Sequence, residues 1–120
     1  MAKKNILIVE DDADMQMIYK DIIKNGYSVI AVSNVEDARK ELKKKKADLM
    51  ILDIILPKVQ GDTFFSELKS SKQYKDMPII VISVIGDLTP QLRQIDPKVV
   101  SIAKPFKKEE LLAAIDKKLK

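Results

Sequence analysis

The stretch from Leu49 to Pro57 places the strongest constraint on the fold. It begins with four apolar residues, continues through Asp53 and three more apolar residues, and ends in a proline. A continuous apolar run of this length is typical of a strand buried on both faces, as in parallel sheets. Pro57 cannot continue the strand, so Asp53 lies where the strand meets a loop. In an open parallel α/β sheet, this edge is where ligands bind.

A lone carboxylate at this position has two interpretations. Asp53 is either a helix cap or solvated loop charge, or it is a nucleophile or metal ligand. The second interpretation requires partner residues elsewhere in the chain, so the ends of the other strands decide between the two.

The rest of the chain alternates short apolar runs with segments of helical periodicity. Strands are predicted over 5–9, 27–32, 48–53, 77–83 and 98–103, and helices over 12–25, 33–46, 62–72, 89–94 and 106–119. This alternation predicts an α/β fold in which a parallel sheet is covered by helices on both faces. Right-handed crossovers favour a doubly wound, five-stranded sheet. The length suits one domain, 1–120.

Local signals refine two of these helices. Met15, Ile18 and Ile22 recur at helical spacing and predict the buried face of the first helix. Residues 33–36 have the capping-box pattern, with Ser33 first and a glutamate last, and predict the start of the second helix.

Composition restricts the chemistry that is available. The chain has no cysteine and no histidine, which excludes disulfides, histidine acid–base catalysis and the usual transition-metal ligand sets. Reactive groups must come from Asp, Glu, Lys, Ser and Thr, and oxygen ligands of this kind suit a hard cation such as Mg²⁺.

The charge balance argues against several partners. The net charge of +4 is only a weak indication of nucleic-acid binding, and no nucleic-acid motif is present. The run Lys43–Lys46 is typical of a solvated helix C-terminus. The apolar run before Glu10 is too short for a membrane span or a signal sequence. We therefore expect a cytoplasmic protein whose domain contacts neither membrane nor nucleic acid directly.

Polar side chains follow four of the predicted strands. They are Glu10, Asp11 and Asp12 after the first strand, Asp53 at the end of the third, Ser83 at the end of the fourth, and Lys104 after the fifth. If the first strand lies between the second and the third, the acids converge on one cleft, and a divalent cation offsets their repulsion. The lysine and the hydroxyl would then pair with an anion at the metal. Together these groups describe a phosphoryl site on an aspartate.

Four stretches of the chain, 8–12, 48–57, 78–83 and 104–106, resemble the receiver domain of two-component response regulators. The resemblance covers essentially the whole chain in order. It implies a flavodoxin-like sheet of strand order 2-1-3-4-5. It also implies that Asp53 is the phosphoacceptor, Ser83 the switch hydroxyl and Lys104 the lysine that pairs with the phosphate.

The resemblance implies a magnesium site as well. Asp11 and Asp53 would bind Mg²⁺, Glu10 would bind it through water, and the backbone carbonyl of Ile55 would be a further ligand. The family often has a cis bond before the proline that follows the lysine, here Lys104–Pro105.

The implied function is signalling. The phosphoryl donor would be a phosphohistidine on a sensor histidine kinase or a histidine phosphotransfer protein, and the output would pass to a downstream protein target. Phosphorylation would draw Ser83 inward and repack the surface of the fourth helix, fifth strand and fifth helix. The chain would not be an enzyme beyond catalysing its own aspartyl phosphorylation and dephosphorylation.

Two departures from the family pattern favour an alternative. Val84 stands where the family usually has a small residue, and Ser101 stands where it usually has an aromatic one. The alternative is a degenerate receiver that serves as a phosphorylation-independent protein-interaction module. An aspartate-nucleophile phosphatase is disfavoured, because that chemistry usually wants a second aspartate where Ile55 stands.

Overall fold

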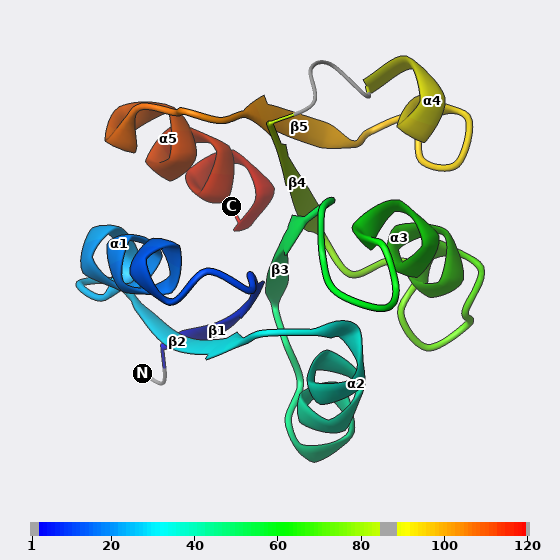
Figure 1. The fold of residues 1–120 in the computed structure, drawn as a ribbon, viewed down its shortest axis with the longest axis horizontal. Helices are drawn as coiled ribbons and strands as arrows, with labels where there is room; N and C mark the ends of the chain where they lie inside the picture. Colours follow the sequence, from blue (N-terminus) through cyan, green and yellow to red (C-terminus); the bar gives the residue numbers. More distant parts are fainter. Residues whose placement is uncertain (1–2, 85–88, 120) are drawn as a thin grey trace.

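The computed structural model describes residues 3–84 and 89–119, in which strands and helices alternate along the chain (Figure 1). In order, the elements are β1 (Lys4–Val9), α1 (Ala13–Ile23), β2 (Tyr27–Val32), α2 (Val35–Lys44), β3 (Leu49–Asp53), α3 (Gly61–Lys69), β4 (Ile79–Ser83), α4 (Thr89–Arg93), β5 (Val100–Ala103) and α5 (Lys108–Leu119). Among these residues, no helix has the length and apolar character that crossing a bilayer requires.

The five strands form one parallel sheet in the order β2-β1-β3-β4-β5. The flavodoxin-like, doubly wound sheet expected from the sequence is therefore confirmed. The register pairs Val9 with Leu52, and Asp53 with Ile82. Because every strand runs the same way, the C-terminal ends of β1, β3, β4 and β5 meet at one edge of the sheet.

Helices cover both faces of the sheet and enclose two separate cores. In Figure 1, α1 and α5 lie on one side, and α2 and α3 lie on the other. Successive residues of the central strand β3 point to opposite faces, so Met50 and Leu52 pack with α2 and α3, whereas Leu49 and Ile51 pack with α1 and α5. All residues of β3 and β4 are buried, as their continuous apolar sequences predict.

The buried face of α1 differs from the prediction. Tyr19 and Ile23 are the buried residues of this helix, whereas Ile18 is 47% exposed. Met15 and Ile22 are partly buried beside them. The tertiary partner decides this orientation, because the Tyr19 ring stacks on Phe106 with ring centroids 5.6 Å apart and a tyrosine buries more area than an isoleucine.

The start of α2 also differs from the capping-box prediction. The N-cap is Asn34 rather than Ser33, and its side chain accepts a hydrogen bond of 2.8 Å from the backbone N–H of Asp37. The Asn34 side-chain amide in turn donates to the Asp37 carboxylate at 3.2 Å. The later start places Val35, the first helical residue, in the core.

Several strands and helices are shorter than predicted. The fifth strand begins at Val100 rather than at residue 98, because the backbone N–H groups of Lys98 and Val99 donate to Asp96 in a turn. Helix α3 spans Gly61–Lys69 instead of 62–72, and α4 ends at Arg93 instead of at residue 94. Gly86, a residue type that disfavours a long fourth helix, lies outside the described residues.

We expect Gly61→Ala to destabilise the protein by about 2 kcal/mol or more. A Cβ atom at Gly61 would overlap the backbone oxygen of Asp53 and the Cα of Ile54, and backbone atoms cannot yield as a flexible side chain can. Urea unfolding measures the change. Gly26→Ala is the matched control, since a Cβ there meets nothing within 4 Å. Equal stabilities of the two variants would contradict the close approach seen at Gly61.

Candidate functional site

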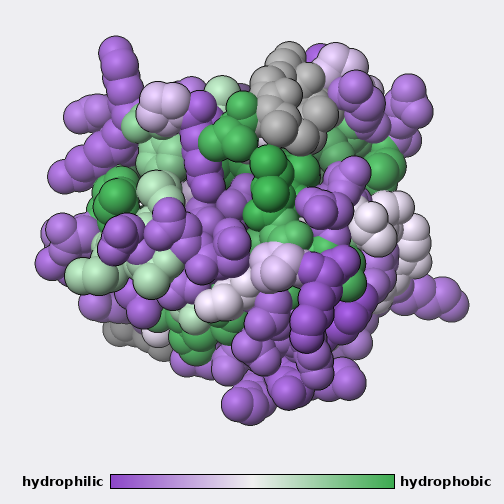
Figure 2. All heavy atoms as spheres, in the orientation of Figure 1, coloured by the Kyte–Doolittle hydropathy of each residue, from purple (hydrophilic) through white to green (hydrophobic). Residues whose placement is uncertain are grey.

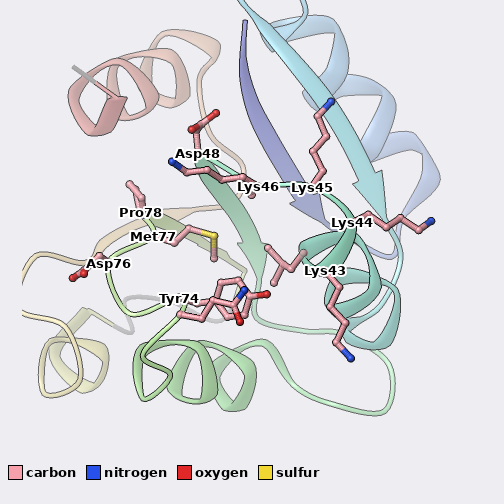
Figure 3. A pocket seen from close by; sticks show the side chains of 12 residues that line it. Lys43, Lys44, Lys45, Lys46, Asp48, Tyr74, Asp76, Met77 and Pro78 are labelled. Carbon is pink, nitrogen blue, oxygen red and sulfur yellow. The ribbon is translucent and has the colours of Figure 1, made fainter. Parts of the chain in front are cut away.

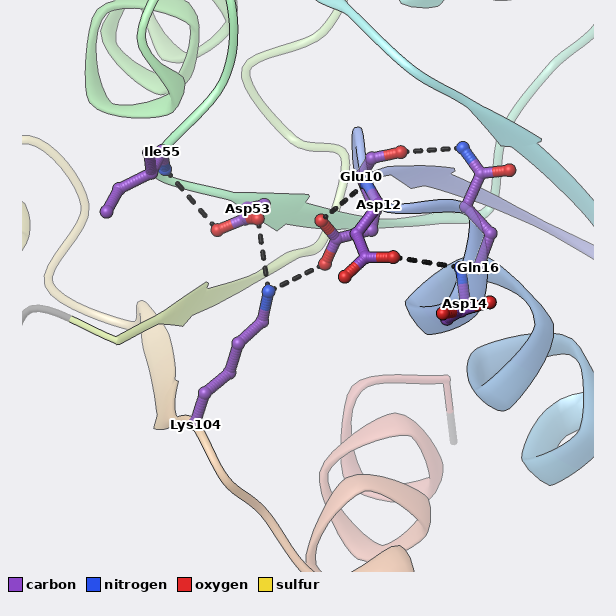
Figure 4. A network of polar contacts seen from close by, with 7 residues as sticks. All are labelled: Glu10, Asp12, Asp14, Gln16, Asp53, Ile55 and Lys104. Carbon is purple, nitrogen blue, oxygen red and sulfur yellow. Dashed lines mark hydrogen bonds and ion pairs between the residues drawn. The ribbon is translucent and has the colours of Figure 1, made fainter.

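The sheet edge brings together three carboxylates from two strand ends that are distant in sequence, and Figure 4 shows two of them, Glu10 and Asp53. Glu10 follows β1 directly, Asp11 is its neighbour, and Asp53 is the last residue of β3. One carboxylate oxygen from each lies within 4.8 Å of the others. Glu10 is 1% exposed and Asp53 5% exposed, whereas Asp11 faces solvent. The cluster is therefore open on the side of Asp11 and closed on the side of Glu10.

Lys104 connects two of these carboxylates. Its ammonium group donates to Oε1 of Glu10 at 2.6 Å and to Oδ2 of Asp53 at 3.1 Å. The Lys104 backbone is fixed as well, because its N–H donates to the Ser83 carbonyl at 2.8 Å, and the Lys104–Pro105 bond is cis, as the resemblance implies. The lysine thus enters the cluster from the end of β5 with both its backbone and its side chain held.

The loop after β3 contributes a backbone donor. The N–H of Ile55 donates to Oδ1 of Asp53 at 3.3 Å, so the two oxygens of this carboxylate have different partners. Ile54 holds the base of the loop, because its N–H donates to the Ile82 carbonyl and its carbonyl accepts from Gly61. The use of the Ile55 carbonyl as a metal ligand stays a prediction.

Ser83 is fully buried at the end of β4 and follows Ile82, the register partner of Asp53. Its role as a switch hydroxyl stays a prediction. The next residue, Val84, is 59% exposed, so the branched side chain that departs from the family pattern stands at the surface. Figure 2 shows a hydrophobic strip on an otherwise mainly hydrophilic face, and Ile55 and Val84 are both exposed large hydrophobic residues.

Burial controls the titration of this cluster. Loss of hydration, together with the nearby Asp53, raises the pKa of Glu10 to about 7, although the hydrogen bond from Lys104 acts in the opposite direction. Burial alone would lower the pKa of Lys104, but its hydrogen bonds to the two carboxylates hold that pKa above its usual value. Glu10 is therefore able to bind a proton near neutral pH in the metal-free cluster.

Two contacts that position Glu10 were not found from the sequence. The side-chain amide of Gln16 donates to the Glu10 backbone carbonyl at 2.6 Å. The N–H of Asp12 donates to Oε2 of Glu10 at 3.2 Å, and the Asp12 carboxylate caps α1 by accepting from Asp14. Asp12 therefore belongs to the helix terminus rather than to the cluster. A glutamine one turn into a helix carries no pattern that would have revealed the Gln16 contact.

The cluster fits a small hard cation. All three converging ligands are carboxylate oxygens, which Mg²⁺ prefers over nitrogen or sulfur, and the exposed Asp11 leaves room for the waters that this ion retains. The composition of the cluster supports the same conclusion, because Lys104 pairs with only two of the three carboxylates, Glu10 and Asp53.

The fold and this edge define a flavodoxin-like domain with an acidic cluster and a lysine at the C-terminal ends of its strands. The family model of the response regulator receiver domain matches residues 6–116. The chain belongs to this family, whose members are signalling modules rather than enzymes in the usual sense and bind Mg²⁺ in an acidic pocket.

Individual relatives agree with the family match. The chain is 36% identical over 123 residues to the "probable C4-dicarboxylate response regulator DctR" of Bacillus subtilis, covering 98% of this chain and 54% of that protein. It also resembles the CheY-like receiver domain protein of Methanospirillum hungatei, with a TM-score of 0.87, 25% identity, and coverage of 98% and 94% of the two chains.

A third likeness shows the fold alone. The receiver domain of the sensor histidine kinase PA1611 of Pseudomonas aeruginosa has a TM-score of 0.83 at 23% identity, with 98% of each chain covered, and its structure contains a magnesium ion in the active-site cleft. The chain spans about half the length of several curated relatives that it matches, DctR among them.

We expect the metal-free protein to lose stability as the pH rises from about 4.5 to about 7. Folding raises the pKa of Glu10, so the folded state binds this proton more tightly than the unfolded state does. The resulting stabilisation is complete below the unfolded pKa and is lost through the folded pKa. The loss should be about 3 kcal/mol. Urea unfolding in EDTA across this range measures it.

Glu10→Gln is the control for this pH dependence, because it removes the titrating group and keeps the shape of the side chain. The chain has no histidine, so few other groups titrate between pH 5 and 7. Parallel stability curves for the two proteins would contradict the raised pKa of Glu10.

Proposed function

We propose that this chain is a phosphoacceptor domain in which Asp53 receives a phosphoryl group in a Mg²⁺-dependent reaction. The observation that carries the proposal is the position of the Lys104 ammonium group, which lies between Glu10 and Asp53 at 2.6 and 3.1 Å. A cation held against the reacting carboxylate is placed to pair with a phosphoryl oxygen once one arrives.

The donor in this proposal is a phosphohistidine on a sensor histidine kinase or a histidine phosphotransfer protein in the cytoplasm. An Asp53 oxygen attacks phosphorus in line, the O–P bond forms as the P–N bond breaks, and the imidazole of the donor leaves. The Ile55 N–H holds the other Asp53 oxygen through a 3.3 Å hydrogen bond, which favours one orientation of the nucleophile.

The ligand set in the proposal is Asp11 and Asp53 directly, Glu10 through water, and the Ile55 carbonyl. When bound, Mg²⁺ neutralises charge that develops on the phosphoryl oxygens. Lys104 then exchanges its contact with the Asp53 carboxylate for one with the phosphoryl group. Glu10 stays buried next to Lys104, and Gln16 keeps the Glu10 backbone in place.

The output in this proposal depends on the end of β4. Ser83 moves toward the phosphorylated Asp53, and this movement passes to the surface of α4, β5 and α5, where a downstream protein target binds. The hydrogen bond from the Lys104 N–H to the Ser83 carbonyl ties the ends of β4 and β5 together, which favours a joint movement. We also propose that residues 1–120 act as one domain.

A second candidate function is a phosphorylation-independent protein-interaction module. Ser101, which is half-buried on β5, supports it, because this small residue stands where the family usually has an aromatic side chain that moves with the switch hydroxyl. The intact acidic cluster opposes it. Titration with Mg²⁺ separates the two, since a scaffold has no need to bind the ion.

We expect acetyl phosphate or beryllofluoride with Mg²⁺ to modify the wild-type protein at Asp53 and to leave Asp53→Ala unmodified. The expectation follows from the convergence of the three acids around this carboxylate. Intact-mass and peptide mass spectrometry measure the adduct. Asp76→Asn, which changes an exposed acid outside the cluster, is the control and should react as the wild type does. An adduct that persists in Asp53→Ala would disprove the assignment.

We expect Val84→Ala to speed the loss of the phosphoryl group by about threefold, roughly 0.6 kcal/mol in the barrier. Val84 follows Ser83 directly and its side chain is exposed, and in the proposal this side chain limits the approach of water to the phosphorylated Asp53. The decay of phosphorylated protein after removal of the donor measures the rate. Ile95→Ala removes an exposed apolar side chain away from the cluster and should leave the rate unchanged. A slower decay in Val84→Ala would contradict the steric role.

A further inference from the structure

The edge of the sheet opposite the acidic cluster carries a high density of positive charge. The last turn of α2 contains Lys43 and Lys44, and the last turn of α5 contains Lys117 and Lys118. Cations at helix C-termini are favoured by the helix dipole, which explains their position without any ligand. The helix dipole does not explain the shape of the surface at this edge.

A hollow of about 550 Å³ opens next to the end of α2. Its apolar lining includes Leu42, Met77 and the partly buried Tyr74, and the run Lys43–Lys46 forms one side. Figure 3 shows Tyr74 and Met77 within the hollow and the side chains of Lys43 and Lys44 extending outward from the helix end. The hollow therefore combines an apolar floor with a rim of four lysines, whose side chains extend in different directions, and of Asp48 and Asp76.

The positive charge continues into a second hollow of about 280 Å³, which shares Asp76 and Pro78 with the first. Lys75, Lys98 and Lys118 line this second hollow. Burial lowers the pKa of Lys118, and neighbouring lysines lower it further, although Asp96 acts in the opposite direction. Lysines at this edge thus repel one another at close range.

Two carboxylates of this surface, those of Asp48 and Asp96, already interact with other groups of the chain. Asp48 accepts a hydrogen bond of 2.7 Å from the backbone N–H of Asn5. Asp96 lies 3.5 Å from the Lys69 ammonium and also accepts from the backbone N–H of Lys98. The larger hollow nevertheless keeps an excess of positive charge, because four lysines line it against two acids, Asp48 and Asp76.

We propose that the larger hollow binds an acidic peptide segment of a partner protein, with one apolar side chain on the Tyr74 and Met77 floor and carboxylates along Lys43–Lys46. Charge complementarity argues for the acidic residues, and the apolar floor argues for a side chain of the leucine type. A nucleic acid would satisfy the lysines with its phosphates, but its bases could stack only on Tyr74, because Leu42 and Met77, the other apolar residues named above, offer no aromatic ring. An anionic membrane would meet the rim and leave the hollow empty.

This site goes beyond the proposed phosphoacceptor function and does not depend on it. None of the described residues that line the hollow belongs to the Glu10, Asp11 and Asp53 cluster. A peptide bound here would leave the phosphorylation edge free for its donor. The Asp53→Ala variant should accordingly bind the peptide as the wild type does, so failure of one proposal can be recognised separately from failure of the other.

The test uses fluorescence anisotropy with a labelled peptide of Glu and Asp residues around one central Leu, at low ionic strength. We expect saturable binding to the 120-residue chain. Lys43→Gln combined with Lys46→Gln should weaken it by about fivefold, since each exposed charge pair contributes modestly. Replacing the central Leu of the peptide by Ser should weaken binding by about tenfold, because the apolar contact is lost.

The matched control is Lys107→Gln combined with Lys108→Gln, which removes the same charge from exposed positions at the start of α5. It should leave the affinity for the peptide within about twofold. The proposal is overturned if the peptide does not bind, if the control weakens binding as much as the rim variant, or if the Leu-to-Ser peptide binds equally well. Tighter binding of oligothymidylate, or of vesicles containing phosphatidylserine, would also overturn it.

Discussion

The rest of the structure depends on the attraction between one lysine and a group of carboxylates that would otherwise repel one another. Glu10 and Asp53 are almost fully buried, and two buried charges of the same sign are costly without a cation between them. Lys104 supplies that cation from a strand that lies two positions away from β3 in the sheet. The site therefore requires this order of the strands in the sheet, because another order would separate Lys104 from the acids.

The same cluster explains why the surrounding loops are so closely fixed. Asp53 is held by the Ile55 N–H on one oxygen and by Lys104 on the other, and Gly61 approaches the Asp53 backbone too closely for any side chain. In the proposed phosphoacceptor role, Asp53 gains from such restraint, because an oriented carboxylate loses less freedom when it reacts. The Lys104 and Ser83 backbones are joined directly, so a change in the contacts of Lys104 has a mechanical path to the end of β4.

The sequence predicts the sheet and the four main residues of the site because both follow from patterns along the chain. Continuous apolar runs define the strands, and Glu10, Asp11, Asp53 and Lys104 stand at or just after their ends. The predicted buried face of α1 was wrong at Ile18. Ile18 and Tyr19 are adjacent and both apolar, and only the stacking of Tyr19 on Phe106 decides which of them is buried. Contacts from a side chain to a distant backbone carbonyl, such as that of Gln16 with Glu10, leave no periodic signal at all.

The direction of the helices gives the molecule two ends of opposite character. Each helix runs back against the parallel strands, so helix N-termini lie at the acidic edge and helix C-termini at the lysine-rich edge. The net charge of +4 averages over these two ends and describes neither of them. In the two proposals, a cation and a phosphoryl donor bind at one end, and an acidic partner binds at the other. Because the sheet separates the two ends, the occupancy of one need not compete with that of the other, and coupling between them would require movement of the strands themselves.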